Sequence, residues 1–160
     1  MKKVLSILIF SCFSLSYAQT SNENLNQQLQ EMRKYFLEEN YTEFSYYVYP
    51  KVIEKIGGVD KMIELTNASI LKIKEDGFEI LDITFKNPSD FITNKNELQV
   101  TITQELIMNT PKGKIASEYT LIGISIDNGK NWKFIDTSGK PKEKMIERFP
   151  NLSSEIIVNP

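Results

Sequence analysis

The sequence contains no histidine, and its single cysteine, Cys12, lies within the first 18 residues. A chain without histidine has no Ser-His-Asp triad, no Cys-His pair and no His-rich metal site. Once the first 18 residues are removed, the chain also has no disulfide, thiol nucleophile or thiolate ligand. We therefore expect no metal site and no cofactor.

The first 18 residues have the three parts of an export signal. Met1–Lys3 is positively charged, Val4–Phe13 is a short apolar stretch, and Ser16 and Ala18 place small residues at positions −3 and −1 of a cleavage site. The apolar stretch is shorter than the ~20 residues that span a bilayer. We expect cleavage after Ala18 and a periplasmic or secreted protein. Acylation of Cys12 and a retained N-terminal helix are the alternatives.

Cleavage would leave residues 19–160 as one domain, long enough to bury a core without disulfides. Lys2 and Lys3 leave with the signal, so 17 basic residues face 21 acidic ones and the net charge is −4. A mildly acidic domain without a basic stripe is a poor nucleic-acid binder, and we expect no nucleic-acid partner. The composition, 41% hydrophobic and 11% aromatic, is typical of a globular domain.

Apolar residues recur at helical spacing in the first half of the chain and with a period of two after Gly77. The spacing predicts helices over residues 21–39, 42–47, 51–56 and 59–76. It predicts strands over 78–85, 97–108, 114–126 and 131–136, and a last helical turn over 142–148. Helices followed by an antiparallel sheet define an α+β fold.

Four segments carry a resemblance to a known group of proteins. They are Tyr49–Glu54 with Gly57-Gly58, Asn96–Gln99, Gly129–Gly139 and Phe149–Ser153, within a match that extends over residues 22–158. The chain resembles a group of small exported bacterial proteins in the nuclear transport factor 2-like (cystatin-like) superfamily. The resemblance implies N-terminal helices packed in the concave face of a strongly curved, cone-like antiparallel sheet. Superfamily relatives include ketosteroid isomerase, scytalone dehydratase, polyketide cyclases and non-enzymatic binding modules, so a pocket is implied but not a reaction.

Residues 125–132 match S-x-D-x-G-x-x-W, the Asp-box pattern of sialidases. In such a hairpin Asp127 accepts hydrogen bonds from turn N–H groups, Gly129 supplies a positive φ and Trp132 packs beneath. Sialidases repeat this box around a propeller and bind a carboxylate with three arginines. This chain has one box and two arginines, Arg33 and Arg148. We therefore interpret the match as a rigid hairpin.

Turns at residues 110–113 and 128–129 would set the strand register, with Gly123 opposite both Val100 and Phe134. One face of the sheet then carries an apolar set: Leu98, Val100, Ile102, Leu106, Leu121, Trp132 and Phe134. The same face carries a polar group, which with Trp132 lines the predicted ligand pocket: Gln104, Tyr119 and Asp136. Asp136 in apolar surroundings would act as a proton shuttle and Tyr119 as an oxyanion donor. Alternatively, Asp136 caps the turn at residues 137–139 and Tyr119 binds it structurally.

The same register sends Ile122, Ile124 and Ile135 to the opposite face. An apolar island on an outer sheet face is a candidate dimer contact, and we expect a homodimer through these residues. The alternative is cover by the loop at residues 87–95 or by the C-terminal segment at 156–158.

These observations favour an exported, non-enzymatic domain that binds a small apolar ligand or a protein partner. The alternative is an enzyme of the isomerase, dehydratase or cyclase type that uses Asp136 and Tyr119.

Overall fold

The computed structural model describes residues 21–159, so the predicted signal peptide, its cleavage site and Cys12 lie outside the described residues. A helix over residues 21–37 is followed by α2 (Tyr41–Ser45), α3 (Pro50–Ile56) and α4 (Val59–Glu75). The strands are β1 (Glu79–Lys86), β2 (Ile92–Asn94), β3 (Glu97–Thr110), β4 (Gly113–Ser125) and β5 (Lys133–Asp136), and α5 (Lys142–Arg148) comes last. The predicted α+β class is confirmed.

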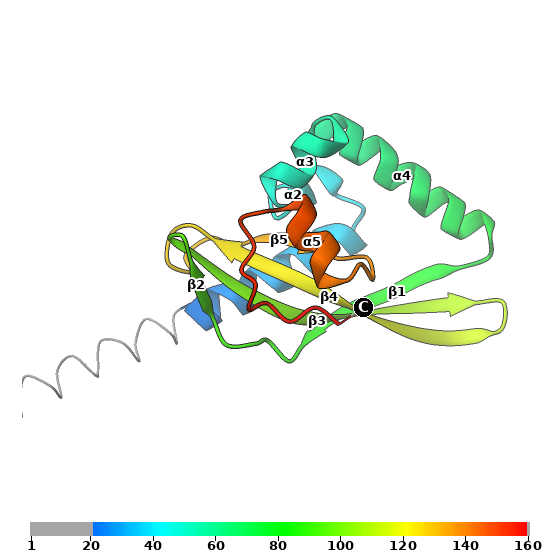
Figure 1. The fold of residues 1–160 in the computed structure, drawn as a ribbon. Coiled ribbons are helices and arrows are strands. Elements are labelled where there is room, and N and C mark those ends of the chain that lie inside the picture. The colour runs from blue at the N-terminus through cyan, green and yellow to red at the C-terminus, as the bar shows by residue number, and fades with distance from the viewer. Residues whose placement is uncertain (1–20, 160) are drawn as a thin grey trace, which may run out of the picture.

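All strand pairs in the sheet are antiparallel, and the order is β1-β3-β4-β5, with β2 also beside β3 (Figure 1). The sheet is not closed into a barrel. The predicted register is confirmed, because Gly123 pairs with Val100 on one side and with Phe134 on the other. In the described part of the chain, no helix is both long and apolar enough to cross a membrane.

Two local features differ from the sequence prediction. Helix α2 begins at Tyr41 with Asn40 as its N-cap, whose side chain accepts a hydrogen bond from the Glu43 amide at 3.3 Å, whereas the spacing predicted a helix from residue 42. Residues 87–96, which the sequence prediction leaves between two strands, contain β2. Lys95 and Asn96, with φ of 49° and 67°, reverse the chain so that Ile92–Asn94 pairs with the start of β3. Two consecutive left-handed residues without glycine are uncommon, so no hairpin was predicted there.

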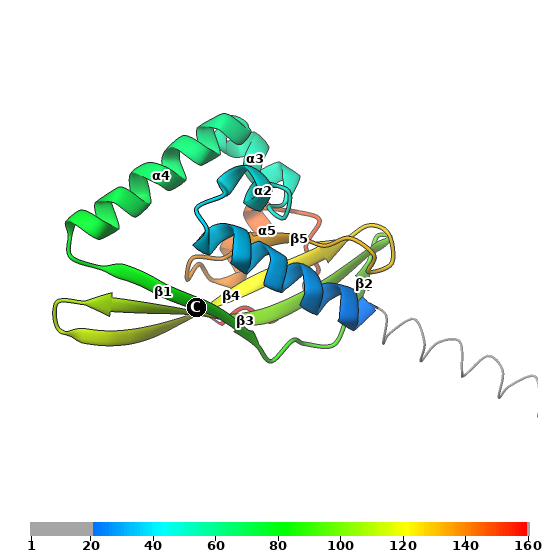
Figure 2. The same cartoon turned by 180° about the vertical axis from the view of Figure 1, so that it is seen from behind.

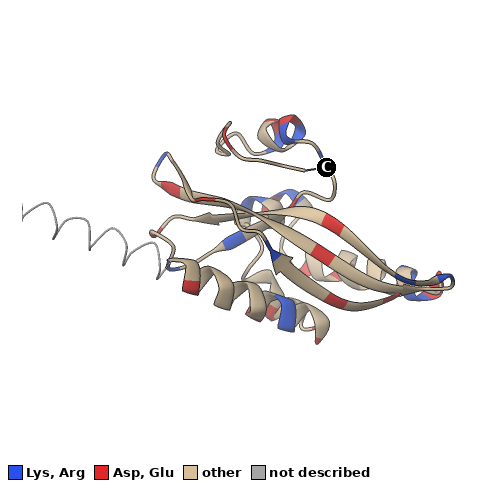
Figure 3. Ribbon diagram, turned by 90° about the horizontal axis from the view of Figure 1, so that it is seen from below, with Lys and Arg blue, Asp and Glu red and all other residues tan. Residues whose placement is uncertain are grey.

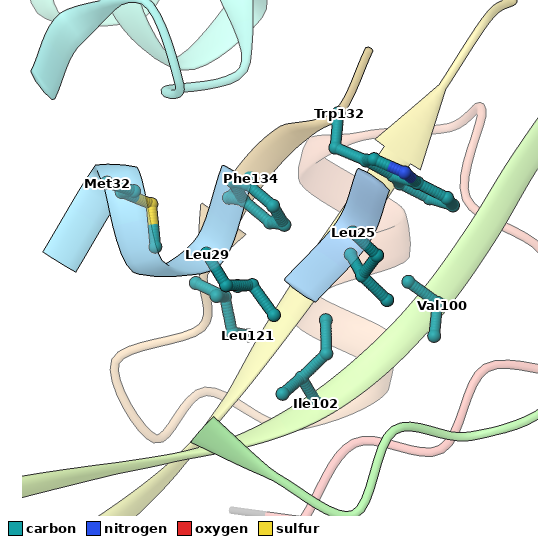
Figure 4. Close-up of a cluster of buried hydrophobic side chains, with 8 residues drawn as sticks. All are labelled: Leu25, Leu29, Met32, Val100, Ile102, Leu121, Trp132 and Phe134. Atoms are coloured by element: carbon teal, nitrogen blue, oxygen red, sulfur yellow. The ribbon is translucent and has the colours of Figure 1, made fainter. Parts of the chain in front are cut away.

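The N-terminal helix packs against one face of the sheet, called here the inner face (Figures 2 and 4). A cluster of buried side chains joins the helix to β3, β4 and the start of β5: Leu25, Leu29, Met32, Val100, Ile102, Leu121, Trp132 and Phe134. Gly123 makes this packing possible, because a Cβ there would lie 2.9 Å from Val100 Cγ1 and 3.3 Å from the Trp132 ring. This cluster is called the inner core.

The loop between β4 and β5 has the hydrogen bonds that the Asp-box pattern predicts. Asp127 Oδ1 accepts from the Asn131 amide at 2.9 Å, and Ser125 Oγ accepts from the Gly129 amide at 2.9 Å. Burial opposes ionisation of Asp127, but hydrogen bonds from Asn131, Ser125 and Lys130 outweigh it and lower the pKa of this carboxyl. The loop is therefore a rigid turn, in agreement with the interpretation from the sequence.

The N-terminal helix also holds this loop through polar side chains. Ser21 Oγ, Asn24 Nδ2 and Gln28 Nε2 donate to the carbonyls of three successive residues, Asn128, Gly129 and Lys130, at 2.8–3.1 Å. Gln28 Oε1 accepts from the Trp132 amide at 2.8 Å. The helix is thus fixed to the sheet by hydrogen bonds at one end and by apolar packing along its length.

The opposite, outer face of the sheet is covered by the C-terminal segment of the same chain (Figure 1). Ile122, Ile124 and Ile135 are 0%, 1% and 2% exposed. They pack against a residue just before α3, one of α5 and three that follow α5, in a second cluster called the outer core: Tyr49, Met145, Phe149, Leu152 and Ile156. The predicted dimer contact through the three isoleucines is therefore wrong. Cover by the C-terminal segment, the alternative left open by the sequence, already removes them from water.

Gln99 fastens this cover to the sheet. Its side chain is fully buried, its Nε2 donates to the Asn151 carbonyl and its Oε1 accepts from the Ser153 amide, both at 2.8 Å. Asn151 Nδ2 donates in turn to the Tyr49 hydroxyl and to Glu97 Oε2. The amide of Gln99 satisfies two backbone groups of an irregular segment in the way that a neighbouring strand would.

Trp132→Ala should destabilise the protein by ~3–5 kcal/mol, because Trp132 is fully buried in the inner core and stacks on Phe91 with ring centroids 5.5 Å apart. Urea unfolding measures the change. Ile126→Ala is the control, since Ile126 is 78% exposed and its truncation should leave the midpoint unchanged. Equal midpoints for Trp132→Ala and the parent would contradict the placement of this ring.

Candidate ligand-binding surface

Helix α4 is amphipathic but buries little of its apolar stripe. Of its 17 residues, Met62 alone is buried, and Met62 belongs to neither core cluster. Ile63, Ile70 and Ile73 share its side of the helix and are half-buried. A helix normally buries such a stripe against its own domain, so α4 leaves apolar surface uncovered.

The half of the sheet beyond the N-terminal helix has a similar uncovered surface on its inner face. Because residues alternate along a strand, Leu106 and Met108 of β3 share the inner face with Val100 and Ile102. Their cross-strand partners on this face include Ile80 and Ile115. Leu106, Met108 and Ile80 are half-buried and Ile115 is 41% exposed, so no layer closes over them.

The two uncovered surfaces lie on the same side of the sheet. Figures 1 and 2 place α4 above the half of the sheet formed by β1 and the β3–β4 hairpin, and Figure 3, seen from below, shows these strands in front of α4. We call the combined set the distal apolar surface: Ile63, Ile70 and Ile73 of α4 with Ile80, Leu106, Met108 and Ile115 of the sheet.

The outer face of the same half of the sheet is charged. Lys86 Nζ lies 2.9 Å from Glu105 Oε1 and 2.8 Å from Glu118 Oε1. The hydrogen bonds that Lys86 donates to Glu118 and Glu105 raise the pKa of Lys86, and the lysine lowers the pKa of Glu105. Figure 3 shows acidic residues along these strands. The outer face therefore suits water, whereas the inner face of the same strands does not.

The polar group predicted from the sequence lies at the border between the inner core and the distal apolar surface. Gln104 pairs with Tyr119 across β3 and β4, and Gln104 Nε2 donates to Asp136 Oδ2 at 2.9 Å. Asp136 is exposed, and its Oδ1 also accepts from the Ser138 amide at 2.6 Å and from the Ser138 hydroxyl at 3.3 Å. Asp136 is thus the cap of the turn at residues 137–139.

Tyr119 and Trp132 do not join Gln104 and Asp136 in the pocket that the sequence predicted. The side-chain hydroxyl of the half-buried Tyr119 has no hydrogen bond to Asp136 or to any other residue that the structure describes. Trp132 is four residues from Asp136 along an extended segment, ~13 Å away, and it lies within the inner core. The structure therefore brings together Gln104 and Asp136, with Tyr119 beside them, and places Trp132 elsewhere.

An ion pair that the sequence did not predict joins the N-terminal helix to the edge strand β1. Arg33, on the N-terminal helix, lies with Nη2 2.6 Å from Asp82 Oδ1, and its Nε donates to Asp82 Oδ1 and to the Ile83 carbonyl. Asp82 follows a bulge in β1, where the register with β3 shifts between Ile80 and Asp82. Arg33 thereby occupies a backbone acceptor on β1, an edge strand that would otherwise expose it.

Glu31 and Tyr47 form a second polar contact on the N-terminal helix. The Tyr47 hydroxyl donates to Glu31 Oε2 at 2.7 Å. Hydrogen bonds from Gln27 and Tyr47 lower the pKa of Glu31, while burial and this hydrogen bond raise the pKa of Tyr47. The Tyr47 hydroxyl and the Glu31 carboxylate are hydrogen-bonded to each other. This contact therefore stabilises the position of the segment before α3 and leaves no free binding group.

Comparison of the sequence with protein-family models finds no matching family, and comparison with curated proteins finds no significant match. What the site can do chemically therefore follows from its own geometry. It consists of a partly uncovered apolar surface bordered by two polar residues, Gln104 and Tyr119, whose side-chain carbonyl oxygen and hydroxyl are available for hydrogen bonding.

Asp136→Ala should destabilise the protein by about 1 kcal/mol, because the turn at residues 137–139 loses its acceptor and Gln104 loses its partner. Tyr119→Phe should leave stability unchanged, since its hydroxyl has no partner among the described residues. Urea unfolding of both variants decides. A stable Asp136→Ala protein would show that the carboxylate is not a structural cap.

Proposed function

We propose that this chain is an exported binding domain that holds a small apolar molecule between α4 and the inner face of the distal half of the sheet. The observation that carries the proposal is the incomplete burial of α4. A 17-residue helix with one buried side chain lies above a sheet surface whose apolar residues are also half-exposed.

The free energy of burying apolar side chains supports a ligand between α4 and the sheet. Full burial of one Leu, Ile or Met side chain stabilises by ~1.5–3 kcal/mol. The apolar residues of α4 and of the sheet obtain only part of this stabilisation in the unliganded chain. A small molecule that contacts both surfaces would supply the rest. Ligand sites usually combine such apolar walls with a few polar groups that fix orientation, and Gln104 and Tyr119 are suitably placed.

The proposal also covers the cellular localisation of the protein and its membership in a superfamily, both as expected from the sequence. We propose that the protein is periplasmic or secreted after cleavage following Ala18, as the single domain 19–160, with lipid attachment at Cys12 as the alternative. Intact-mass analysis of the exported protein distinguishes the two. We also propose membership in the nuclear transport factor 2-like superfamily. Helices that precede the sheet in sequence and pack on one of its faces support this, as does the open sheet.

The isomerase, dehydratase or cyclase alternative has less support. A proton shuttle requires a carboxyl group kept from water in the site. Asp136 is exposed and accepts three hydrogen bonds that hold it as a turn cap. Tyr119 has no contact that would align it with Asp136. We therefore propose binding without catalysis.

A neutral fluorophore that brightens in apolar surroundings, N-phenyl-naphthylamine, tests the proposal. We expect saturable binding to the parent protein. Ile70→Glu should weaken that binding at least tenfold, because it places a charge among the half-buried residues of the distal apolar surface.

Ile126→Glu is the matched control. It makes the same change of side chain at an isoleucine that is 78% exposed on the loop between β4 and β5, and it should bind the fluorophore as the parent does. Absence of saturable binding to the parent, or an equal loss in both variants, would overturn the proposed function. Urea unfolding of Ile70→Glu confirms that the variant is folded before binding is compared.

A further inference from the structure

The side of α4 that faces away from the sheet has an unusual arrangement of exposed residues. Figures 1 and 2 show α4 at the margin of the molecule, with its outward side turned away from the rest of the described chain. With about 3.6 residues per turn, one outward stripe collects seven exposed residues: Lys61, Glu64, Leu65, Ala68, Leu71, Lys72 and Glu75. Leu65 is 45% exposed and Leu71 is 59% exposed.

This stripe is symmetric about Ala68. Leu65 and Leu71 lie three residues before and after it, and Glu64 and Lys72 lie four residues before and after it. Lys61 and Glu75 are the third such pair, seven residues to either side. Each pair joins two leucines or two opposite charges, and the smallest side chain lies at the centre.

We propose that the outward stripe of α4 packs antiparallel against the same stripe of a second copy of this chain, with Ala68 at the two-fold axis. A two-fold axis brings each residue to the level of its symmetric counterpart. Lys61 then meets the partner's Glu75, Glu64 meets the partner's Lys72, and Leu65 lies level with the partner's Leu71. The small side chain of Ala68 allows the two helix axes to approach closely at the crossing point.

Charge complementarity indicates that the partner of this surface is a second copy of the chain. Among the residues of the outward stripe, each end of the helix pair gathers two lysines and two glutamates, whose charges cancel, whereas a parallel pair would place like charges at the same level. In the single chain, Lys61 Nζ pairs with Glu64 Oε1 at 2.7 Å and Lys72 Nζ pairs with Asp76 Oδ1 at 2.8 Å. These exposed pairs contribute little to stability, so the lysines are free to reach across to the partner.

The dimer is independent of the proposed ligand. The outward stripe and the distal apolar surface are on opposite sides of α4, so each surface remains open when the other is occupied. The interface has two leucines and one alanine per chain, and a helix of 17 residues is ~25 Å long. We therefore expect a weak dimer that forms reversibly with increasing concentration.

Sedimentation equilibrium of the chain over micromolar to about 1 mM concentration measures the association. The parent should dimerise. Glu64→Lys should weaken dimerisation at least tenfold, because each charge cluster then holds three lysines and one glutamate. Lys72→Glu should also weaken it, because each charge cluster then holds three glutamates and one lysine. The double variant Glu64→Lys/Lys72→Glu should recover most of the parent association, since its clusters are again neutral.

Glu147→Lys is the matched control for loss of a surface ion pair. Glu147 pairs with Lys144 on α5 at 2.8 Å and three residues apart, as Lys61 pairs with Glu64 on α4. This variant should dimerise as the parent does. The proposal is overturned by a parent that stays monomeric up to about 1 mM, by equal weakening in Glu147→Lys, or by a double variant no better than the single ones.

Discussion

Strand β4 determines the arrangement of the whole domain, because its two faces belong to two different cores. Leu121 belongs to the inner core beneath the N-terminal helix, and Gly123 leaves room there for Val100, Phe134 and Trp132. Ile122 and Ile124 belong to the outer core beneath the C-terminal segment. A slip of one residue in the register would exchange these two sets, and neither cover would then fit. The register of β4 thus fixes which segment packs on which face.

The N-terminal helix on the inner face and the C-terminal segment on the outer face both end near the same position along the strands. On the inner face, Arg33 binds Asp82 and the Ile83 carbonyl close to the end of the N-terminal helix. On the outer face, Thr120 exchanges hydrogen bonds with the backbone of Asn159 at the end of the chain. Beyond this level the outer face is charged and the inner face is apolar, so only the inner face needs a further layer. Helix α4 lies on that side of the sheet but packs chiefly against α2 and α3, and this is why we place a ligand there.

The local and strand-level features could be predicted from the sequence, because they depend on nearby residues. Gly57 ends α3, and the turn signals set a register in which Gly123 opposes Phe134, so the inner and outer sets of residues follow by alternation. Contacts between distant segments could not be predicted in this way. The pairing of Gln99 with Asn151 and Ser153 joins β3 to residues more than fifty positions away, and no local pattern marks it. The prediction of a dimer contact through Ile122, Ile124 and Ile135 failed for this reason, since the sequence did not reveal which segment covers Ile124.

Amide hydrogen exchange of the unliganded protein tests the central claim most directly, which is that one half of the sheet is closed by two cores and the other half is open. The slowest amides should lie in residues 99–102, 121–125 and 134–135, where both faces are covered. Amides of α4 and of residues 106–117 should exchange much faster, although they too are in hydrogen-bonded helix and strand. If α4 exchanged as slowly as β4, the helix would be part of a closed core, and the account of an open apolar surface would be contradicted.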